Sequence, residues 1–387
     1  YILRGQIYAA LGERDRATEA LERAIRLDPT NDFAIMRLGV VDYGDGRTES
    51  ALARFQRAIE LNPESKWAYL WRGIVYSESS DLSKARDALN KALKLDPRFD
   101  LALYNLGWIE LKEQKKNYAT AEQLFRRALA VNPAYKEALY GLGMVYGYQK
   151  EYQVARGYLS NALELDPGFL TAWKWRGIVN YELGEFEAAL DDFSTGLELD
   201  PSSADLFVRR ARVAILQDAH QKALSDLQFA RKFDPENPRI YLYLAQVYQT
   251  LGQANLALEE VNKAIDLNPR YGDAFGLKGD LHAAMDEGRE SAIEAYRMAL
   301  DVTSYRPERF AIPLAQLLRA NDQSEEALVE LMQIVEEARD SAEFWLEIVY
   351  ASIAAGKFSK AAEALKEYVR IAPASDKIPE LERLIRM

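Results

Sequence analysis

Apolar residues recur at helical spacing in two consecutive runs between residues 170 and 203. The runs cover residues 172–183 and 188–199, and each places its apolar residues on one stripe at the i, i+3, i+4 spacing of an amphipathic helix. Gly184 separates them. Pro201 ends the second run, because proline cannot continue a helix and disfavours helical dihedrals in the residue before it. The pattern predicts a helix A, a tight turn, a helix B and a stop.

This helical hairpin recurs along the chain with a period of 34 residues. The stop recurs at Pro29, Pro63, Pro97, Pro133, Pro167, Pro201, Pro235 and Pro269, with one two-residue slip before Pro133. The eighth position is small in most repeats, and the twentieth is Ala17, Ala51, Ala85, Ala121, Ala155, Ala189, Ala223 or Ala257. Glycine inside a helix costs about 1 kcal/mol relative to alanine, so a recurrent glycine indicates close packing. We therefore expect helices A and B to cross at the small residues.

The repeat resembles the tetratricopeptide repeat. That motif has a large apolar residue at position 4, small residues at 8, 20 and 27, glycine at 15, an aromatic residue at 24 and proline at 32. Residues 170–203 match it at Trp173, Gly177, Gly184, Ala189, Phe193 and Pro201, with Gly196 at position 27. The resemblance covers essentially the whole chain in about eleven repeats. It implies an all-α fold, a right-handed α-solenoid superhelix of stacked antiparallel helix pairs.

The repeats predict one superhelix over residues 1–375, with repeat 1 truncated, followed by a capping helix over 376–387. Residues 112–117 form a longer turn, interpreted as a solvated loop. The register loosens over 287–313, where an extra residue is placed near Glu287 and Pro313 is expected to kink a helix A. Tyr1 falls on the fourth position of a repeat, so the chain is interpreted as a fragment of a longer protein.

Composition narrows the classes of function. With 49% hydrophobic and 11% aromatic residues, the chain can bury a continuous core. Its net charge of -11 argues against binding to nucleic acid or to an anionic membrane surface. No cysteine, phosphate-binding loop, zinc-binding His pair or 18-residue apolar run is present. We therefore expect no enzyme activity, catalytic residue, cofactor, metal site or membrane insertion. For location, the cytoplasm is favoured, with the bacterial periplasm as the alternative.

Two sets of polar residues recur with the repeat, and both are interpreted as structural. The first set ends helix B, at Asp28, Asp96, Asp166, Asp200 and Asp234. A catalytic pair of carboxylates must flank one bond, whereas these residues lie a whole repeat apart. The second set occupies position 7, at Arg4, Arg72, Arg176 and Arg210, where we expect packed stems and guanidinium groups at the surface.

The family's architecture implies that helix A lines a concave groove through positions 2, 5, 6, 9, 12 and 13. Trp173 and Trp175 illustrate the difference between core and groove positions, because residues two apart on a helix point about 200° apart. Trp173 is assigned to the core and Trp175 to the groove. The predicted groove residues are Phe33, Met36, Trp67, Trp71, Tyr104, Trp108, Tyr140, Met144, Tyr148, Trp175 and Tyr181. If eight aromatics were half exposed, the patch would measure roughly 600–1,000 Å². The alternative is that these residues pack between neighbouring repeats.

Beyond the aromatic residues, the sequence places a basic cluster at Lys174, Arg209, Arg212 and Arg239. Such a cluster is suited to an acidic side chain or a C-terminal carboxylate, and its alternative is a solvated charge cluster.

The sequence thus leads to a non-enzymatic scaffold or adaptor that binds a peptide or helix of a protein partner in the aromatic groove. Two alternatives remain. The chain is a structural or regulatory repeat arm of a larger enzyme or of a bacterial envelope or secretion complex, or it is a homo-oligomerisation module.

Overall fold

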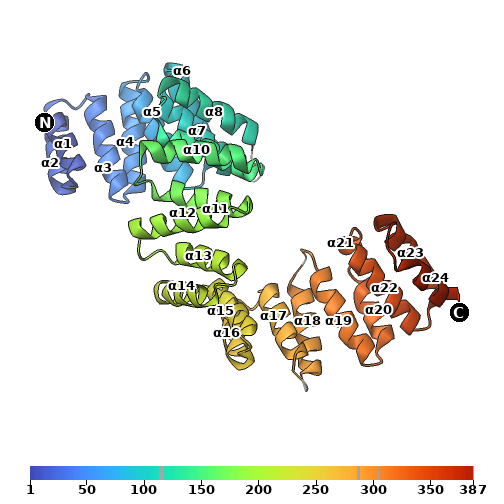
Figure 1. Cartoon of the computed structure of the whole chain (residues 1–387). Coiled ribbons are helices and arrows are strands. Elements are labelled where there is room, and N and C mark those ends of the chain that lie inside the picture. The colour runs from blue at the N-terminus through green and yellow to red at the C-terminus, as the bar shows by residue number, and fades with distance from the viewer. Residues whose placement is uncertain (113–116, 286–287, 304, 387) are drawn as a thin grey trace. The chain divides into compact units, whose positions relative to one another are not determined.

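The computed structural model describes residues 1–112, 117–285, 288–303 and 305–386, and every regular element among them is a helix. The chain divides into two compact units, Tyr1–Asp200 and Pro201–Met387. In each unit, consecutive helices pack against one another as antiparallel pairs (Figure 1). The predicted all-α solenoid of stacked helix pairs is therefore confirmed. One continuous superhelix over residues 1–375 stays a prediction.

The described residues of unit 1 form six helix pairs, drawn in blue to green in Figure 1. Its helices are α1 (Ile2–Ala10), α2 (Arg14–Leu27), α3 (Asp32–Gly44), α4 (Thr48–Leu61), α5 (Lys66–Glu78), α6 (Leu82–Leu95), α7 (Asp100–Lys112), α8 (Tyr118–Val131), α9 (Lys136–Tyr148), α10 (Tyr152–Leu165), α11 (Leu170–Glu182) and α12 (Phe186–Leu199). Odd-numbered helices are the A helices and even-numbered helices the B helices of this unit. Of the predicted loop 112–117, residues 113–116 lie outside the described residues.

Unit 2 begins with the same alternation and departs from it later. Its helices are α13 (Ala204–Leu216), α14 (His220–Phe233), α15 (Pro238–Thr250), α16 (Ala254–Leu267), α17 (Gly272–Ala283), α18 (Arg289–Val302), α19 (Glu308–Ala320), α20 (Ser324–Met332), α21 (Val335–Ala338), α22 (Ala342–Ala354), α23 (Phe358–Ile371) and α24 (Ile378–Arg386). Helix α24 occupies most of the segment predicted to cap the repeats.

Unit 2 contains a split helix that the sequence did not indicate. Glu287, near which the extra residue was placed, lies outside the described residues. Helix α19 continues without a break through Pro313, so a kink there stays a prediction. The helix B expected after it is instead split into α20 and α21. At the break the Ile334 amide donates to the carbonyl of Leu331, three residues back, which tightens the turn.

The turn between helices A and B has the same backbone conformation in most repeats. Its central residue is left-handed, with φ between 70° and 77° at Gly12, Gly46, Gly184, Gly252 and Gly356. Four other repeats place Ser80, Lys150, Asp218 and Asp322 there with φ between 54° and 63°. Glycine reaches this region without a steric penalty, which explains the sequence signal at position 15. The B helices end on extended Asp or Asn residues before the prolines, as predicted for Asp28, Asp96 and Asp166.

The predicted close crossing of helices A and B is also present. The alanines at position 20 are fully buried, from Ala17 to Ala257. A Cβ atom added to Gly177 would lie 2.5 Å from the Phe193 ring, and one added to Gly39 would lie 2.8 Å from Phe55. Position 8 is therefore small because the aromatic or leucine side chain of position 24 occupies the space of a Cβ atom.

One buried carboxylate organises the pair α3 and α4. Asp42 is 2% exposed and accepts hydrogen bonds from Arg47, from the Ser50 hydroxyl at 2.6 Å and from Arg54. Burial acts to raise the pKa of Asp42, but these hydrogen bonds together hold it below its usual value. The carboxylate is therefore ionised at neutral pH and joins the two helices.

We expect Asp42→Asn to destabilise the protein by about 1–3 kcal/mol at pH 7, because charge-assisted hydrogen bonds are lost. The pKa of Asp42 is lower in the folded than in the unfolded state. Its contribution is therefore complete above about pH 4 and is lost as the pH falls through the folded-state pKa. Urea unfolding of both proteins between about pH 3 and pH 7 measures this difference. A difference in stability that is as large at pH 3 as at pH 7 would contradict the assignment.

Candidate functional site

The predicted groove residues lie on the A helices α3, α5, α7, α9 and α11, all within unit 1. We call them the A-helix surface. Three of its side chains are exposed: Phe33 and Trp67 at 39% each and Tyr148 at 37%. Phe33 and Trp67 occupy position 2 of consecutive repeats, whose A helices α3 and α5 are in contact. These three aromatic residues are the most exposed part of the A-helix surface.

The other aromatic residues of this surface are half-buried and contact one another. Trp108 lies 5.8 Å from Tyr140 in the next repeat and 5.9 Å from the core residue Phe125, measured between ring centroids. Tyr104 packs 5.1 Å from Tyr135, and Tyr140 packs 5.3 Å from Phe169. Aromatic pairs at these separations contribute about 0.5–1.5 kcal/mol beyond their burial. Packing between repeats therefore accounts for much of the aromatic signal in the sequence.

Trp71, Trp175 and Tyr181 complete the half-buried set. Trp71 lies 6.2 Å from Tyr43, and Trp175 meets the exposed Tyr148 edge-on at 5.7 Å. Tyr181 contacts Phe186 of the following B helix at 5.9 Å. Trp175 thus connects the exposed Tyr148 to the packed interior of unit 1.

Two predicted groove residues do not reach the surface. Met36 is 1% exposed and Met144 is 5% exposed, and both belong to hydrophobic clusters. Both occupy positions that the family pattern assigns to the groove, but the neighbouring helices cover them. The estimated patch of eight half-exposed aromatics is likewise too large. Three exposed rings leave on the order of 200 Å² accessible, since one aromatic side chain carries roughly 150–250 Å².

The tyrosines of the A-helix surface are neutral hydrogen-bonding groups. Burial raises the pKa of the hydroxyl groups of Tyr104, Tyr140 and Tyr148 above the ordinary value. All three therefore keep their protons at neutral pH. The A-helix surface consequently offers apolar rings and uncharged hydroxyl groups.

The four residues of the predicted basic cluster belong to different units. Lys174 lies on α11 in unit 1 and is half-buried, whereas Arg209, Arg212 and Arg239 lie on α13 and α15 in unit 2. Arg209 donates to Asp205 at 3.0 Å, and Arg212 lies over the Tyr243 ring at 5.9 Å. Since Asp205 offsets one charge, binding of an acidic group by this cluster stays a prediction.

Two of the four position-7 arginines make ion pairs that the sequence pattern did not predict. Arg176 binds Asp192 and Arg210 binds Asp226, at 2.6 and 2.7 Å for the shortest contacts. Both guanidinium groups are therefore engaged inside the repeat, while the side chains remain 21% and 28% exposed. The sequence did contain a signal. Aspartate occupies position 23 in these two repeats, and both also carry arginine at position 7.

The described residues include no cluster of three or more His, Cys, Asp or Glu side chains that could hold a metal ion. None of the helices in the described part of the chain has both the length and the hydropathy of a membrane-spanning segment.

Comparison with protein families identifies the repeat. Models of the tetratricopeptide repeat match residues 36–98, 73–130, 113–147, 140–204, 176–238 and 312–376. Two further tetratricopeptide models match residues 1–31 and 214–281. No curated protein sequence matches the chain.

Solved structures are similar to the chain at low sequence identity. PilW, described as a widely conserved type IV pilus biogenesis factor, is 21% identical with a TM-score of 0.51, covering 54% of this chain and 96% of PilW. PilF of Pseudomonas aeruginosa is 20% identical with a TM-score of 0.49, covering 55% and 96%. Yeast Tom70 is 16% identical with a TM-score of 0.49, covering 100% and 98%. At 21% identity the likeness to PilW shows the fold alone.

Proposed function

Because the chain belongs to the tetratricopeptide repeat family, we propose that it is a non-enzymatic scaffold that binds an extended or helical segment of a partner protein. The proposed contact region is the A-helix surface of unit 1. Phe33, Trp67 and Tyr148 are its anchors, and the half-buried aromatics behind them hold the A helices in place.

The observation that carries this proposal is the exposure of these three aromatic side chains. Aromatic residues gain more from burial than most side chains, and they dominate the energetics of protein interfaces. Phe33, Trp67 and Tyr148 nevertheless each keep more than a third of their surface accessible. Neutral tyrosine hydroxyls beside apolar rings favour a partner segment with apolar side chains and backbone polar groups over a highly charged one.

We expect the triple variant Phe33→Ala, Trp67→Ala, Tyr148→Ala to lose partner binding by about 100-fold or more, since interface anchors contribute about 2 kcal/mol or more each. The test is affinity capture from a lysate of the source cells, with the intact chain and the variant as parallel baits and mass spectrometry as the readout. A protein retained by the intact chain and lost by the variant, and then bound directly when purified, would support the proposal.

A matched control removes the same number of exposed apolar side chains elsewhere in unit 1. Leu95, Leu165 and Leu199 end the B helices α6, α10 and α12 and are 40–48% exposed. Their triple alanine variant should retain the partner. If both triple variants retain the same proteins as the intact chain, the A-helix surface is not the contact region. Recovery of the chain itself would instead favour the homo-oligomerisation alternative. Recovery of the subunits of one larger enzyme or envelope complex would favour the alternative that the chain is a repeat arm of that complex.

A further inference from the structure

Four repeats place an arginine at position 7 of helix A, and each of these arginines follows an aromatic residue by three positions. In three of them the guanidinium group lies over that ring. The distances from the guanidinium carbon to the ring centroid are 5.2 Å for Arg72 over Tyr69, 4.6 Å for Arg176 over Trp173 and 5.7 Å for Arg210 over Phe207. Stacking on an aromatic face fixes the plane of a guanidinium group. The three arginines are therefore held in a similar way.

In two of these arginines, the edge formed by Nε and Nη2 binds an aspartate carboxylate. Arg176 donates from Nε to Asp192 Oδ2 at 3.1 Å and from Nη2 to Oδ1 at 2.6 Å. Arg210 donates to Asp226 in the same way, at 2.9 and 2.7 Å. A planar arginine fork matches the two oxygens of a carboxylate. Each aspartate occupies position 23 of helix B in the same repeat.

Arg72 also lies over an aromatic ring, but its repeat has no aspartate at position 23. Its Nη1 donates to Gln56 Oε1 at 2.7 Å, just as Arg176 Nη1 donates to Ser160, which occupies the equivalent position of the preceding repeat. The residue at position 23 is Ala88. The Arg72 Nε atom is buried and has no hydrogen-bond partner within the described residues. An unpaired buried donor is costly, so this edge favours an acceptor.

The remaining position-7 arginine is satisfied differently. Arg4 also has alanine, Ala20, at position 23, but its Nε and Nη2 atoms donate to the Tyr8 hydroxyl at 3.1 and 3.0 Å. Arg72 thus combines a vacant aspartate position with an unpartnered Nε, which neither Arg4 nor the two aspartate-bound arginines do.

Arg72 lines a cavity of about 770 Å³ on the B-helix side of unit 1. Lys91, Lys94 and Arg127 line the same cavity, and Asp87 is the one carboxylate among its lining residues in the described part of the chain. Positive charge around a cavity attracts an anionic ligand despite the net charge of -11 for the whole chain.

We propose that this cavity binds an acidic segment of a partner protein, with one Asp or Glu carboxylate held by the guanidinium group of Arg72. Further carboxylates of the same segment contact Lys91, Lys94 and Arg127. The site lies between α4, α5, α6 and α8 and does not depend on the A-helix surface. The repeats of Arg176 and Arg210 each supply this carboxylate internally, whereas the repeat of Arg72 receives it from the partner.

The test uses a fluorescent hexaglutamate peptide and the full chain, with binding followed by fluorescence anisotropy at about 10 mM salt, where charge interactions act over long distances. The intact chain is expected to bind the peptide and not a hexaglutamine peptide. Ala88→Asp adds an internal carboxylate beside Asp87, as Asp191 and Asp192 occur together in the repeat of Arg176. It should weaken binding by more than about tenfold. The neutral variant Ala88→Asn should change binding by less than about threefold.

Two further variants separate this site from general charge effects. Ala20→Asp adds the same charge beside Arg4 and should leave binding within about twofold. Arg72→Lys keeps the charge but removes the bidentate fork, and should weaken binding by about fivefold or more even if Ala88→Asp fails to fold. Free glutamate at the same carboxylate concentration should not compete with the peptide. The proposal is overturned if the intact chain does not bind hexaglutamate, if folded Ala88→Asp or Arg72→Lys binds as tightly as the intact chain, or if free glutamate competes equally.

Discussion

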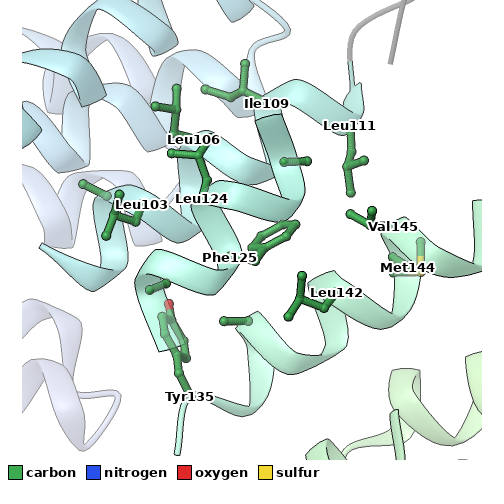
Figure 2. Close-up of a cluster of buried hydrophobic side chains, with 14 of the residues drawn as sticks. Leu103, Leu106, Ile109, Leu111, Leu124, Phe125, Tyr135, Leu142, Met144 and Val145 are labelled. Carbon is green, nitrogen blue, oxygen red and sulfur yellow. The ribbon is translucent and has the colours of Figure 1, made fainter. Parts of the chain in front are cut away.

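Replacement of Phe125 by alanine is expected to destabilise unit 1 by about 3–5 kcal/mol, the range for removing an aromatic side chain from a packed core. Phe125 lies on α8, is fully buried, and is surrounded by side chains from α7, α8 and α9 (Figure 2). A Cβ atom added to Gly107 or to Gly141 would lie 2.7 Å from its ring. One ring therefore fills the space between the A helices of two consecutive repeats.

Because repeat proteins can unfold in parts, the measurement should be local. Hydrogen exchange followed by mass spectrometry reports the stability of α7, α8 and α9 separately. We expect amides in these three helices to exchange faster in Phe125→Ala. The control is Phe33→Ala, which removes an exposed ring from the same unit and should change exchange little. Unchanged exchange in α7 to α9 would show that the neighbouring side chains refill the space of the ring.

The fold was predictable from the sequence because its signals are local and repeated. Asp166 before Pro167 and Gly184 with a left-handed backbone each act within a few residues of themselves. Gly177 at the crossing with Phe193 is a contact between helices, but it recurs in the other repeats and so could be inferred. Because the same contact between helices recurs in several repeats, it is visible as a repeated residue pattern in the sequence.

The exposure of the A-helix surface was less predictable. Helical periodicity places a side chain around its own helix, but does not give the position of the helix in the next repeat. Met36 and Met144 were therefore assigned to the groove although neighbouring helices cover them. Trp67 and Trp108 received the same assignment, whereas the structure leaves Trp67 exposed and surrounds Trp108 with aromatic rings.

The acidic partner of Arg176 was missed for a different reason. Asp192 lies 16 residues away on the following helix, so no helical spacing connects the two residues. Comparing repeats position by position reveals the pair, because Arg210 and Asp226 repeat it. The same comparison singles out Arg72. Variation between repeats therefore carries information about binding that the shared pattern does not.

Trp108→Ala is expected to destabilise unit 1 by about 3 kcal/mol, whereas Trp67→Ala should cost less than about 1 kcal/mol. Both residues are tryptophans on A helices of unit 1, so the pair is a matched comparison. Trp108 lies between Phe125 and Tyr140 and contributes to packing across two repeats. Trp67 is 39% exposed and meets Phe99 edge-on at 4.8 Å. Urea unfolding followed by far-UV circular dichroism measures both changes.

A double-mutant cycle between Trp108 and Tyr140 tests whether Trp108 joins the two repeats. We expect a coupling free energy of about 0.5–1.5 kcal/mol, the range for aromatic pairs. Partner binding provides a second measurement, because we assign Trp108 to packing between repeats and Trp67 to the contact with the partner. Trp67→Ala should weaken binding in a protein of nearly unchanged stability, because its ring is an anchor. Equal losses of stability in the two single variants would contradict this division, since Trp67 would then belong to the packing between repeats as well.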